Sequence, residues 1–265
     1  MTGTRKRVTT LQLQKMKQSK SPITMLTAYD FTLAKILDEA DVDVLLVGDS
    51  LGMVVQGHET TIPVTLEEMI YHGRLVVRGA ERAMVIVDLP FPHGQLGVQK
   101  TLEVAAQVMK ETGCQAVKLE GGADQAETIA ALASAGIPTM AHIGLRPQSV
   151  HQLGGYRVQR DEQRLEADAT AAQAAGAFSV LMECVPSGLA KGVTAKLQVP
   201  TIGIGAGPDC DGQVLVTHDL LGLTVGRVPK FVRQTASLAD AIRAGVAEYN
   251  ASVRDRSFPN SEESF

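Results

Sequence analysis

The chain has 265 residues, of which 45% are hydrophobic and 20% are charged, with 25 Gly and no Trp. This is the composition of an ordinary globular protein with a sizeable core, and it excludes a disordered or collagen-like chain. The 25 Lys and Arg residues against 29 Asp and Glu give a net charge of −4, which argues against nucleic acid and anionic lipid as partners.

The N-terminal segment is basic, with every Lys and Arg of the first 29 residues preceding the first acidic residue, Asp30. A cleaved transit peptide is one interpretation, but the segment has no apolar signal core. We favour an N-terminal helical segment over 1–22, with a short helix at about Thr10 to Gln18 that lies across one end of the domain.

From about Ile23 onward, short Val-, Ile- and Leu-rich runs alternate with longer Ala-rich amphipathic segments. This alternation is typical of repeated βα units around a buried parallel sheet. Eight such runs would close a (β/α)₈ barrel. The predicted strands are 23–28, 44–48, 84–88, 116–120, 138–143, 179–183, 200–204 and, more weakly, 220–225.

Helix signals occupy the segments between these runs, including Thr65 as an N-cap and glycines that end several helices. No linker divides the chain, so we predict one α/β barrel domain over 1–265 with a polar C-terminal tail over 250–265. An open doubly wound sheet is the competing fold, but the first strand lacks the Gly-rich turn that normally follows it. The predicted helices are 31–40, 65–79, 101–112, 124–135 and 161–175.

The lengths of the aliphatic runs and the spacing of the cysteines indicate the compartment of the protein. The aliphatic runs are far shorter than the roughly 20 residues of a membrane-spanning helix. Cys114, Cys184 and Cys210 have no CxxC spacing, which argues against disulfides and structural zinc and fits a reducing cytoplasm. Two segments, 49–64 and 143–160, are too long for simple connectors, and long loops of this kind are often functional lids.

Polar residues recur where the predicted strands end. Because the C-terminal ends of parallel strands meet at one mouth of a barrel, these side chains would surround a common ligand. They are Asp49, Asp88, Lys118, Glu120, His142 and Glu183.

The two aspartates offer hard oxygen ligands without a neighbouring His or Cys, which indicates Mg²⁺ or Mn²⁺ with water and substrate as the remaining ligands. Asp49 could instead cap a helix, and Asp88 could instead form a turn before Pro90. Their corresponding places at two strand ends favour a metal site.

Lys118 and Glu120 are two residues apart in a strand and therefore share a face, the barrel interior or its rim. Lys118 could hold a substrate carboxylate and Glu120 a metal-bound water, although a structural Lys–Glu pair is the alternative. Glu183 lies among apolar residues that should raise its pKa, so it is a candidate proton acceptor, or else the partner of a nearby cation. His142 fits a buried structural histidine as well as a catalytic one.

The glycine run Gly203 to Gly207 follows the seventh predicted strand, where many barrels bind phosphate. Such a run is a weak signal, because glycine also simply permits a close backbone approach.

Taken together, these residues resemble the ketopantoate hydroxymethyltransferase family from about residue 9 to the end of the chain. The matching motifs include Thr27-Ala28-Tyr29-Asp30, Val47-Gly48-Asp49-Ser50-Leu51-Gly52-Met53, Asp88-Leu89-Pro90-Phe91, Val117-Lys118-Leu119-Glu120-Gly121-Gly122, His142-Ile143-Gly144-Leu145, Pro147-Gln148, Gly154-Gly155-Tyr156 and Glu183-Cys184-Val185-Pro186.

The resemblance implies a Mg²⁺-dependent transfer of a hydroxymethyl group from 5,10-methylenetetrahydrofolate to 3-methyl-2-oxobutanoate through a metal-stabilised enolate, giving ketopantoate for pantothenate and coenzyme A synthesis. It also implies a large homo-oligomer, typically a decamer. Among the site residues, it implies that Asp49 and Asp88 hold the metal, that Glu120 positions a metal-bound water, and that Glu183 is the general base. Ser50 and Lys118 would contact the substrate carboxylate.

Two alternatives and one departure remain. A lyase or mutase similar to the phosphoenolpyruvate mutase and isocitrate lyase group would use a similar barrel, but the Lys-Lys-Cys-Gly type of signature typical of that group is not found in this chain. A non-catalytic barrel that binds a ketoacid is the other alternative. The family usually continues the Asp88 motif with Met, a small residue and Tyr, whereas this chain has Pro92 to Gly97, so the loop beside a proposed metal ligand is altered.

Overall fold

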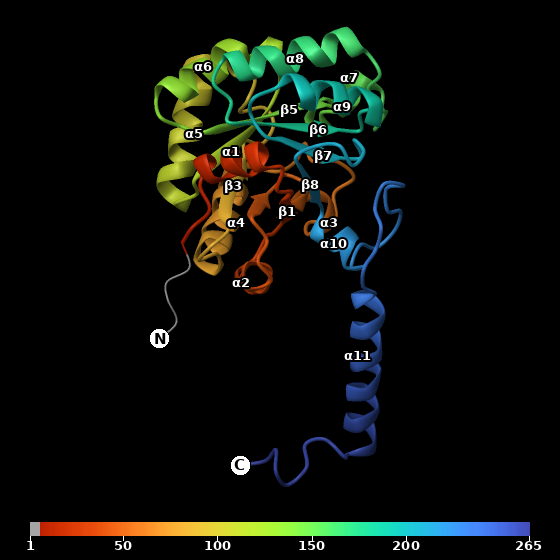
Figure 1. The fold of residues 1–265 in the computed structure, drawn as a ribbon. Helices are drawn as coiled ribbons and strands as arrows, with labels where there is room; N and C mark the ends of the chain where they lie inside the picture. Colours follow the sequence, from red (N-terminus) through yellow and green to blue (C-terminus); the bar gives the residue numbers. More distant parts are fainter. Residues whose placement is uncertain (1–5) are drawn as a thin grey trace. The chain divides into compact units, whose positions relative to one another are not determined.

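The computed structural model describes residues 6–265. The strands lie side by side in chain order and in parallel, and β1 pairs with β8, so the sheet closes into a barrel with helices around it (Figure 1). This closure confirms the predicted (β/α)₈ fold. The strands are β1 (Ile23–Thr27), β2 (Val44–Val47), β3 (Met84–Asp88), β4 (Ala116–Glu120), β5 (Thr139–Gly144), β6 (Ser179–Glu183), β7 (Thr201–Ile204) and β8 (Gly212–Leu215).

The described part of the chain forms two compact units, of which the barrel unit ends at Val216 and the second runs from Thr217 to Phe265. A single domain over 1–265 therefore stays a prediction, and residues 1–5 of the predicted N-terminal segment lie outside the described residues. None of the helices within 6–265 combines the length and the apolar character that crossing a bilayer requires.

Most predicted helices are present, and α2, α4 and α8 match their predicted bounds within one residue. Thr65 caps α4 in a capping box, because its hydroxyl accepts from the Glu68 backbone and the Glu68 carboxylate accepts from the Thr65 backbone. The helices are α1 (Thr10–Ser19), α2 (Phe31–Glu39), α3 (Leu51–Val54), α4 (Leu66–Gly79), α5 (Val98–Thr112), α6 (Ala126–Ser134), α7 (Val150–Leu153), α8 (Glu162–Ala174), α9 (Ser187–Lys196), α10 (Thr217–Leu220) and α11 (Leu238–Asp255), with 3₁₀ turns η1 (Ala123–Gln125) and η2 (Pro147–Ser149).

Helix α1 lies at the N-terminal end of the barrel, as predicted. Leu13 is buried in the same cluster as Ile23 and the other interior residues of the strands. Lys17 Nζ lies 2.7 Å from a carboxylate oxygen of Asp211, the residue just before β8. The helix therefore closes the end of the barrel opposite to the strands' C-terminal ends.

The predicted eighth strand at 220–225 is wrong, because β8 is Gly212–Leu215 and Leu220 ends helix α10. A Cβ atom at Gly212 would lie 2.5 Å from the carbonyl oxygen of Ile23, so glycine is required where β8 approaches β1. The strand consequently lacks the Val- and Ile-rich run on which the sequence prediction depended. Helices α9 and α11 were not predicted, and α11 extends to Asp255, into the expected polar tail.

Alternate residues of the strands contribute to two different groups of buried side chains. Val44 and Ile86 belong to the group inside the barrel, and their neighbours Leu45 and Val85 belong to the group between the strands and the surrounding helices. Both faces of the sheet are therefore buried, which is what the nearly continuous apolar runs indicate.

Candidate active site

The interior face becomes polar toward the C-terminal end of the barrel. On β4, Ala116 lies in the interior cluster, and Lys118 and Glu120 follow at alternate positions and are buried. Strand pairing places Asp88 opposite Lys118 and Glu120 opposite His142. Five of the predicted site residues thus share this face because of strand register: Asp88, Lys118, Glu120, His142 and Glu183.

Asp88 and Lys118 form a buried ion pair, with Lys118 Nζ 2.8 Å from Asp88 Oδ2. The same carboxylate oxygen accepts a hydrogen bond from the backbone N–H of Asp49 at 3.3 Å. Asp49 follows β2, and its side chain is bound by Gln148 rather than capping a helix. Asp49 therefore does not cap a helix, and Asp88 pairs with Lys118, while the role of the two aspartates as metal ligands stays a prediction.

Burial and the charge of the partner have opposite effects on the pKa of each member of this ion pair. Burial is the main cause that raises the pKa of Asp88 to about 7; Lys118 opposes this rise and the neighbouring Asp49 adds to it. Burial alone would lower the pKa of Lys118, but the carboxylates of Asp88, Asp49 and Glu120 raise it above its usual range. Lys118 is therefore a permanent cation surrounded by acidic groups.

His142 lies between Lys118 and Glu183. Its Nδ1 is 3.1 Å from Lys118 Nζ and its Nε2 is 3.2 Å from Glu183 Oε2, although Nε2 makes no aligned hydrogen bond. Burial and then Lys118 lower the pKa of His142 well below its usual value. Because an ammonium group only donates, Nδ1 accepts, and the proton of the neutral ring is on Nε2, which faces Glu183.

Burial also shifts the pKa values of the two glutamates of the group, Glu183 and Glu120. Burial raises the pKa of Glu183 to about 8, and Asp49 and Asp88 add to this effect while Lys118 opposes it. Burial likewise raises the pKa of Glu120 well above its usual value. Two acids with raised pKa values, the buried Glu120 and the partly exposed Glu183, beside a fixed cation are the kind of arrangement found at proton-transfer sites.

Ser50 follows Asp49 in the chain and contacts Tyr29, a residue whose role sequence reasoning did not identify. The Tyr29 hydroxyl and Ser50 Oγ are 2.8 Å apart, and the Tyr29 carbonyl oxygen lies 2.6 Å from His72 Nδ1 on α4. Tyr29 is buried directly after β1, so its place at a strand end was the signal that could have identified it.

Gln148 is a second residue that sequence reasoning left without a role. It lies in η2, within the long segment after β5, and its backbone N–H and side-chain amide contact Glu120 and Asp49. That long segment therefore returns over the mouth of the barrel, and η2 and α7 occupy part of it.

The side-chain oxygens at this site are suitable ligands for a hard cation that takes few ligands from the protein. Among residues 6–265, no group of three His, Cys, Asp or Glu side chains forms a ready-made metal cluster. However, Asp88 Oδ1 is buried without a hydrogen-bond partner, and the surrounding acceptors are oxygens. Mg²⁺ usually takes one or two carboxylates plus water and substrate, so the residues present fit it.

The structure explains the glycine run after β7 by close packing of the backbone and not by phosphate binding. A Cβ at Gly207 would lie 2.3 Å from Ser187 Cβ, and one at Gly203 would lie 2.9 Å from Cys210 Sγ. Close packing thus accounts for both glycines without a phosphate.

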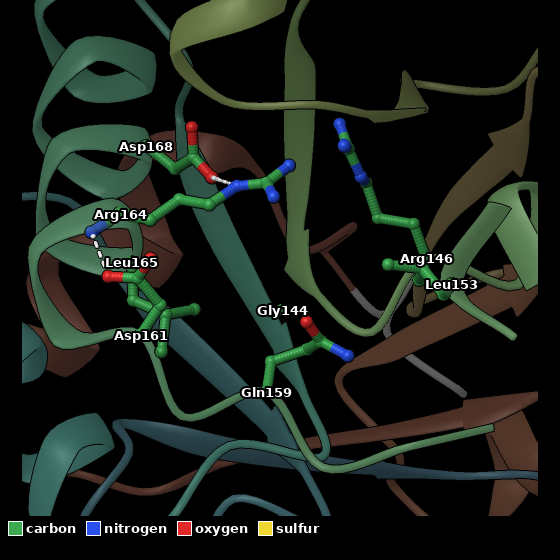
Figure 2. A pocket seen from close by; sticks show the side chains of 8 residues that line it. All are labelled: Gly144, Arg146, Leu153, Gln159, Asp161, Arg164, Leu165 and Asp168. Carbon is green, nitrogen blue, oxygen red and sulfur yellow. Dashed lines mark hydrogen bonds and ion pairs between the residues drawn. The ribbon is translucent and has the colours of Figure 1, made fainter. Parts of the chain in front are cut away.

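A small pocket beside β5 is separate from this group (Figure 2). It contains about 320 Å³, including solvent at its mouth, and is lined in part by Gly144. Arg146 and Arg164 face it together with Asp161 and Asp168, so the charges of its lining balance. None of the candidate site residues lines it.

Comparison with known proteins identifies the family. The family model described as ketopantoate hydroxymethyltransferase matches residues 7–261. The chain belongs to the ketopantoate hydroxymethyltransferase family. A 3-methyl-2-oxobutanoate hydroxymethyltransferase of Rhodopirellula baltica is 62% identical over 259 residues, covering 98% of this chain and 96% of the relative. The corresponding protein of Desulforapulum autotrophicum is 55% identical over 259 residues, covering 98% of both chains. The predicted family and enzyme class are confirmed.

Solved structures support the fold. A phosphonopyruvate hydrolase in complex with oxalate and Mg²⁺ has a TM-score of 0.63 at 13% identity, covering 97% of this chain and 93% of that one. A 2,3-dimethylmalate lyase has a TM-score of 0.60 at 18% identity, covering 97% of this chain and 91% of that one. At such low identity these similarities concern the barrel alone.

Proposed function

We propose that this chain transfers a hydroxymethyl group from 5,10-methylenetetrahydrofolate to 3-methyl-2-oxobutanoate, giving 2-dehydropantoate, with Mg²⁺ as cofactor. Family membership supports the reaction. The observation that carries the residue roles is the row of Lys118, His142 and Glu183 on neighbouring strands. In it, His142 lies 3.1 Å from Lys118 and 3.2 Å from Glu183. The Lys118 ammonium, which would bind the substrate carboxylate, therefore lies close to Glu183, which would accept the proton of the branched carbon.

Lys118 and Ser50 are the proposed carboxylate-binding groups. The Lys118 ammonium has Asp88 and His142 as neighbours, and a substrate carboxylate would complete its hydrogen bonds. Ser50 is held by the Tyr29 hydroxyl, which restricts its rotation. Together they would orient the ketoacid with its branched carbon toward Glu183.

Glu183 is the proposed general base. It removes the proton from the branched carbon of the ketoacid, and the resulting enolate carbon forms a bond to the methylene carbon of the folate. Both carbon–nitrogen bonds of that methylene group break. Water supplies the hydroxyl group of the product, and its remaining proton together with the proton taken up by Glu183 passes to the two folate nitrogens. His142, as a neutral ring with its proton on the nitrogen facing Glu183, is a positioning residue that orients the carboxylate for this transfer.

Asp49 and Asp88 are the proposed protein ligands of Mg²⁺, and Glu120 would hold one of its waters. When bound, the ion would supply a Lewis acid that withdraws electrons from the keto group and a positive charge that offsets the surrounding carboxylates.

The proposed enzyme is a homodecamer of the cytoplasm. The family resemblance supports the oligomer, and Ile242, Val246 and Tyr249 share one face of α11 and are exposed, as expected for a surface that another copy covers. Three free cysteines are compatible with a reducing compartment.

The deciding experiment is an assay for 2-dehydropantoate with the purified protein, run with and without 5,10-methylenetetrahydrofolate and with Mg²⁺ or a chelator. Product that requires both the folate and the metal is the expected result. A protein that makes no product under any of these conditions would contradict the proposed function.

A further inference from the structure

Gln148 contacts three different strand ends at the mouth of the barrel. Its side-chain nitrogen Nε2 lies 2.8 Å from Asp49 Oδ2, after β2, and 2.9 Å from the carbonyl oxygen of Leu89, after β3. Its backbone N–H lies 3.1 Å from Glu120 Oε2, at the end of β4, and 3.3 Å from Oε1. One buried residue thus links the carboxylate of Asp49, a proposed metal ligand, with that of Glu120, which is proposed to hold a metal-bound water.

The chemistry of its neighbours fixes the orientation of the Gln148 amide. A carboxylate oxygen and a backbone carbonyl oxygen are both acceptors, so the group that faces them must be the donating NH₂. The carbonyl oxygen Oε1 then faces away from them. It is buried and has no hydrogen-bond partner, which is unusual for a buried polar atom and calls for a donor that the chain itself does not supply.

We propose that Gln148 is a positioning residue of the divalent-cation site: it holds Asp49 and Glu120 in place, and its Oε1 accepts a hydrogen bond from a water of the bound ion. This inference rests on the proposed function for the identity of the site. A cation's hydration water is a strong donor, and side chains that orient metal ligands through hydrogen bonds typically change metal affinity 10- to 100-fold when they are lost.

The contacts also explain why one residue can act on both carboxylates. The hydrogen bond from Nε2 occupies Asp49 Oδ2 and restricts rotation of that carboxylate, which leaves its other oxygen for a ligand. The backbone N–H of Gln148 bonds both oxygens of Glu120, and this bond survives any side-chain substitution. Replacing the side chain therefore tests the Asp49 contact and the free carbonyl without removing the anchor on Glu120.

Gln148→Met tests the proposal, because it keeps the length of the side chain and removes both the donor and the acceptor. Gln152→Met is the matched control, since Gln152 lies in α7 of the same segment but is exposed. Isothermal titration of the purified proteins with MgCl₂ alone, without substrate, measures the affinity directly. We expect Gln148→Met to bind Mg²⁺ about 10- to 100-fold more weakly and Gln152→Met to bind like the wild type.

A steady-state measurement separates positioning from general loss of structure. Raising the Mg²⁺ concentration should restore kcat of Gln148→Met to within about threefold of the wild type, while the Mg²⁺ concentration for half-maximal activity rises with the dissociation constant. If Gln148→Met does not fold, Gln148→Asn, which keeps the amide but cannot span both contacts, carries the same expectation.

Mg²⁺ affinity of Gln148→Met within twofold of the wild type would overturn the proposal. So would a wild-type protein that binds no Mg²⁺. Failure of the proposed function is distinguishable, because it would appear as absence of product from the wild type while Mg²⁺ binding and its dependence on Gln148 persist.

Discussion

Lys118 and Asp88 occupy paired positions on β4 and β3, and Lys118 Nζ lies 2.8 Å from Asp88 Oδ2 inside the barrel. The Lys118 ammonium lies near four acids, since Asp49, Glu120 and Glu183 adjoin the same pair. Burying such an excess of negative charge is costly unless another cation compensates it or the acids take up protons. The raised pKa values of Asp88 and Glu183 show that these acids tend to take up protons. A bound divalent ion would instead compensate the negative charge.

Asp88→Asn should fold but bind Mg²⁺ more than about 10-fold more weakly, because a neutral amide replaces an ionised ligand of nearly the same shape. Asp209→Asn is the matched control, since Asp209 pairs with Lys191 on the surface at 3.3 Å and exposed pairs contribute little. Circular dichroism checks the fold and titration calorimetry checks the affinity. Equal Mg²⁺ binding by Asp88→Asn and the wild type would exclude Asp88 as a ligand.

The stability of the metal-free protein should depend on pH through Glu183. Its pKa is about 8 in the folded protein against an ordinary value of 4.5, so between these values the folded state holds a proton that the unfolded chain has released. The free energy of unfolding therefore falls as pH rises from about 4.5 to 8.

The neutral variant Glu183→Gln lacks this titration and isolates its effect. Urea unfolding of both proteins in EDTA at pH 5, 6, 7 and 8 should give a stability difference that moves in favour of the variant as pH rises. A difference that stays constant over this range would show that the pKa of Glu183 is not raised.

Gly144, at the end of β5, should tolerate no side chain. A Cβ there would lie 2.4 Å from the carbonyl oxygen of Glu183, and its φ is +86°. Gly136 has a similar φ of +79° but open space around it, so Gly136→Ala should cost only the backbone strain of about 1–2 kcal/mol. Gly144→Ala should cost at least about 3 kcal/mol, because the clash adds to that strain. Denaturant unfolding of the pair measures the difference, and equal losses would refute the role of the close approach.

The protein should assemble into an oligomer. Light scattering on the purified protein should give a mass several times the 28.1 kDa of the chain. The exposed apolar face of α11 is the candidate contact, so Val246→Glu should lower the mass while Lys191→Glu, on exposed α9 surface, should not. A wild-type monomer at micromolar concentration would contradict this prediction.

The sequence predicts those parts of the site that depend on one strand at a time. Alternation places Lys118 and Glu120 on the interior face, and their position at a strand end places them at the mouth of the barrel. The contact between His142 and Glu183 could not be predicted in this way, because it depends on the register of β5 against β6. Gln148 could not be predicted either, since its position depends on how a long loop returns to the barrel. The same limit explains the error at β8, where Gly212 is required by a neighbouring strand and not by any local propensity.

The last prediction separates proton abstraction from carbon–carbon bond formation, because Glu183 is proposed to act only in the first step. With Mg²⁺ and 3-methyl-2-oxobutanoate but no folate, the wild type should exchange the proton of the branched carbon with deuterated solvent, which proton NMR detects. Glu183→Gln keeps the size of the side chain but cannot accept the proton, so exchange should fall by roughly 10²- to 10⁴-fold.

Binding of the ketoacid should persist in Glu183→Gln, since Lys118 and Ser50 are unchanged, and calorimetry checks this separately. His142→Gln is the informative companion, because a positioning residue should slow exchange less than loss of the base itself and leave the dependence on Glu183 intact. Exchange at the wild-type rate in Glu183→Gln, with the ketoacid still bound, would mean that another group takes the proton.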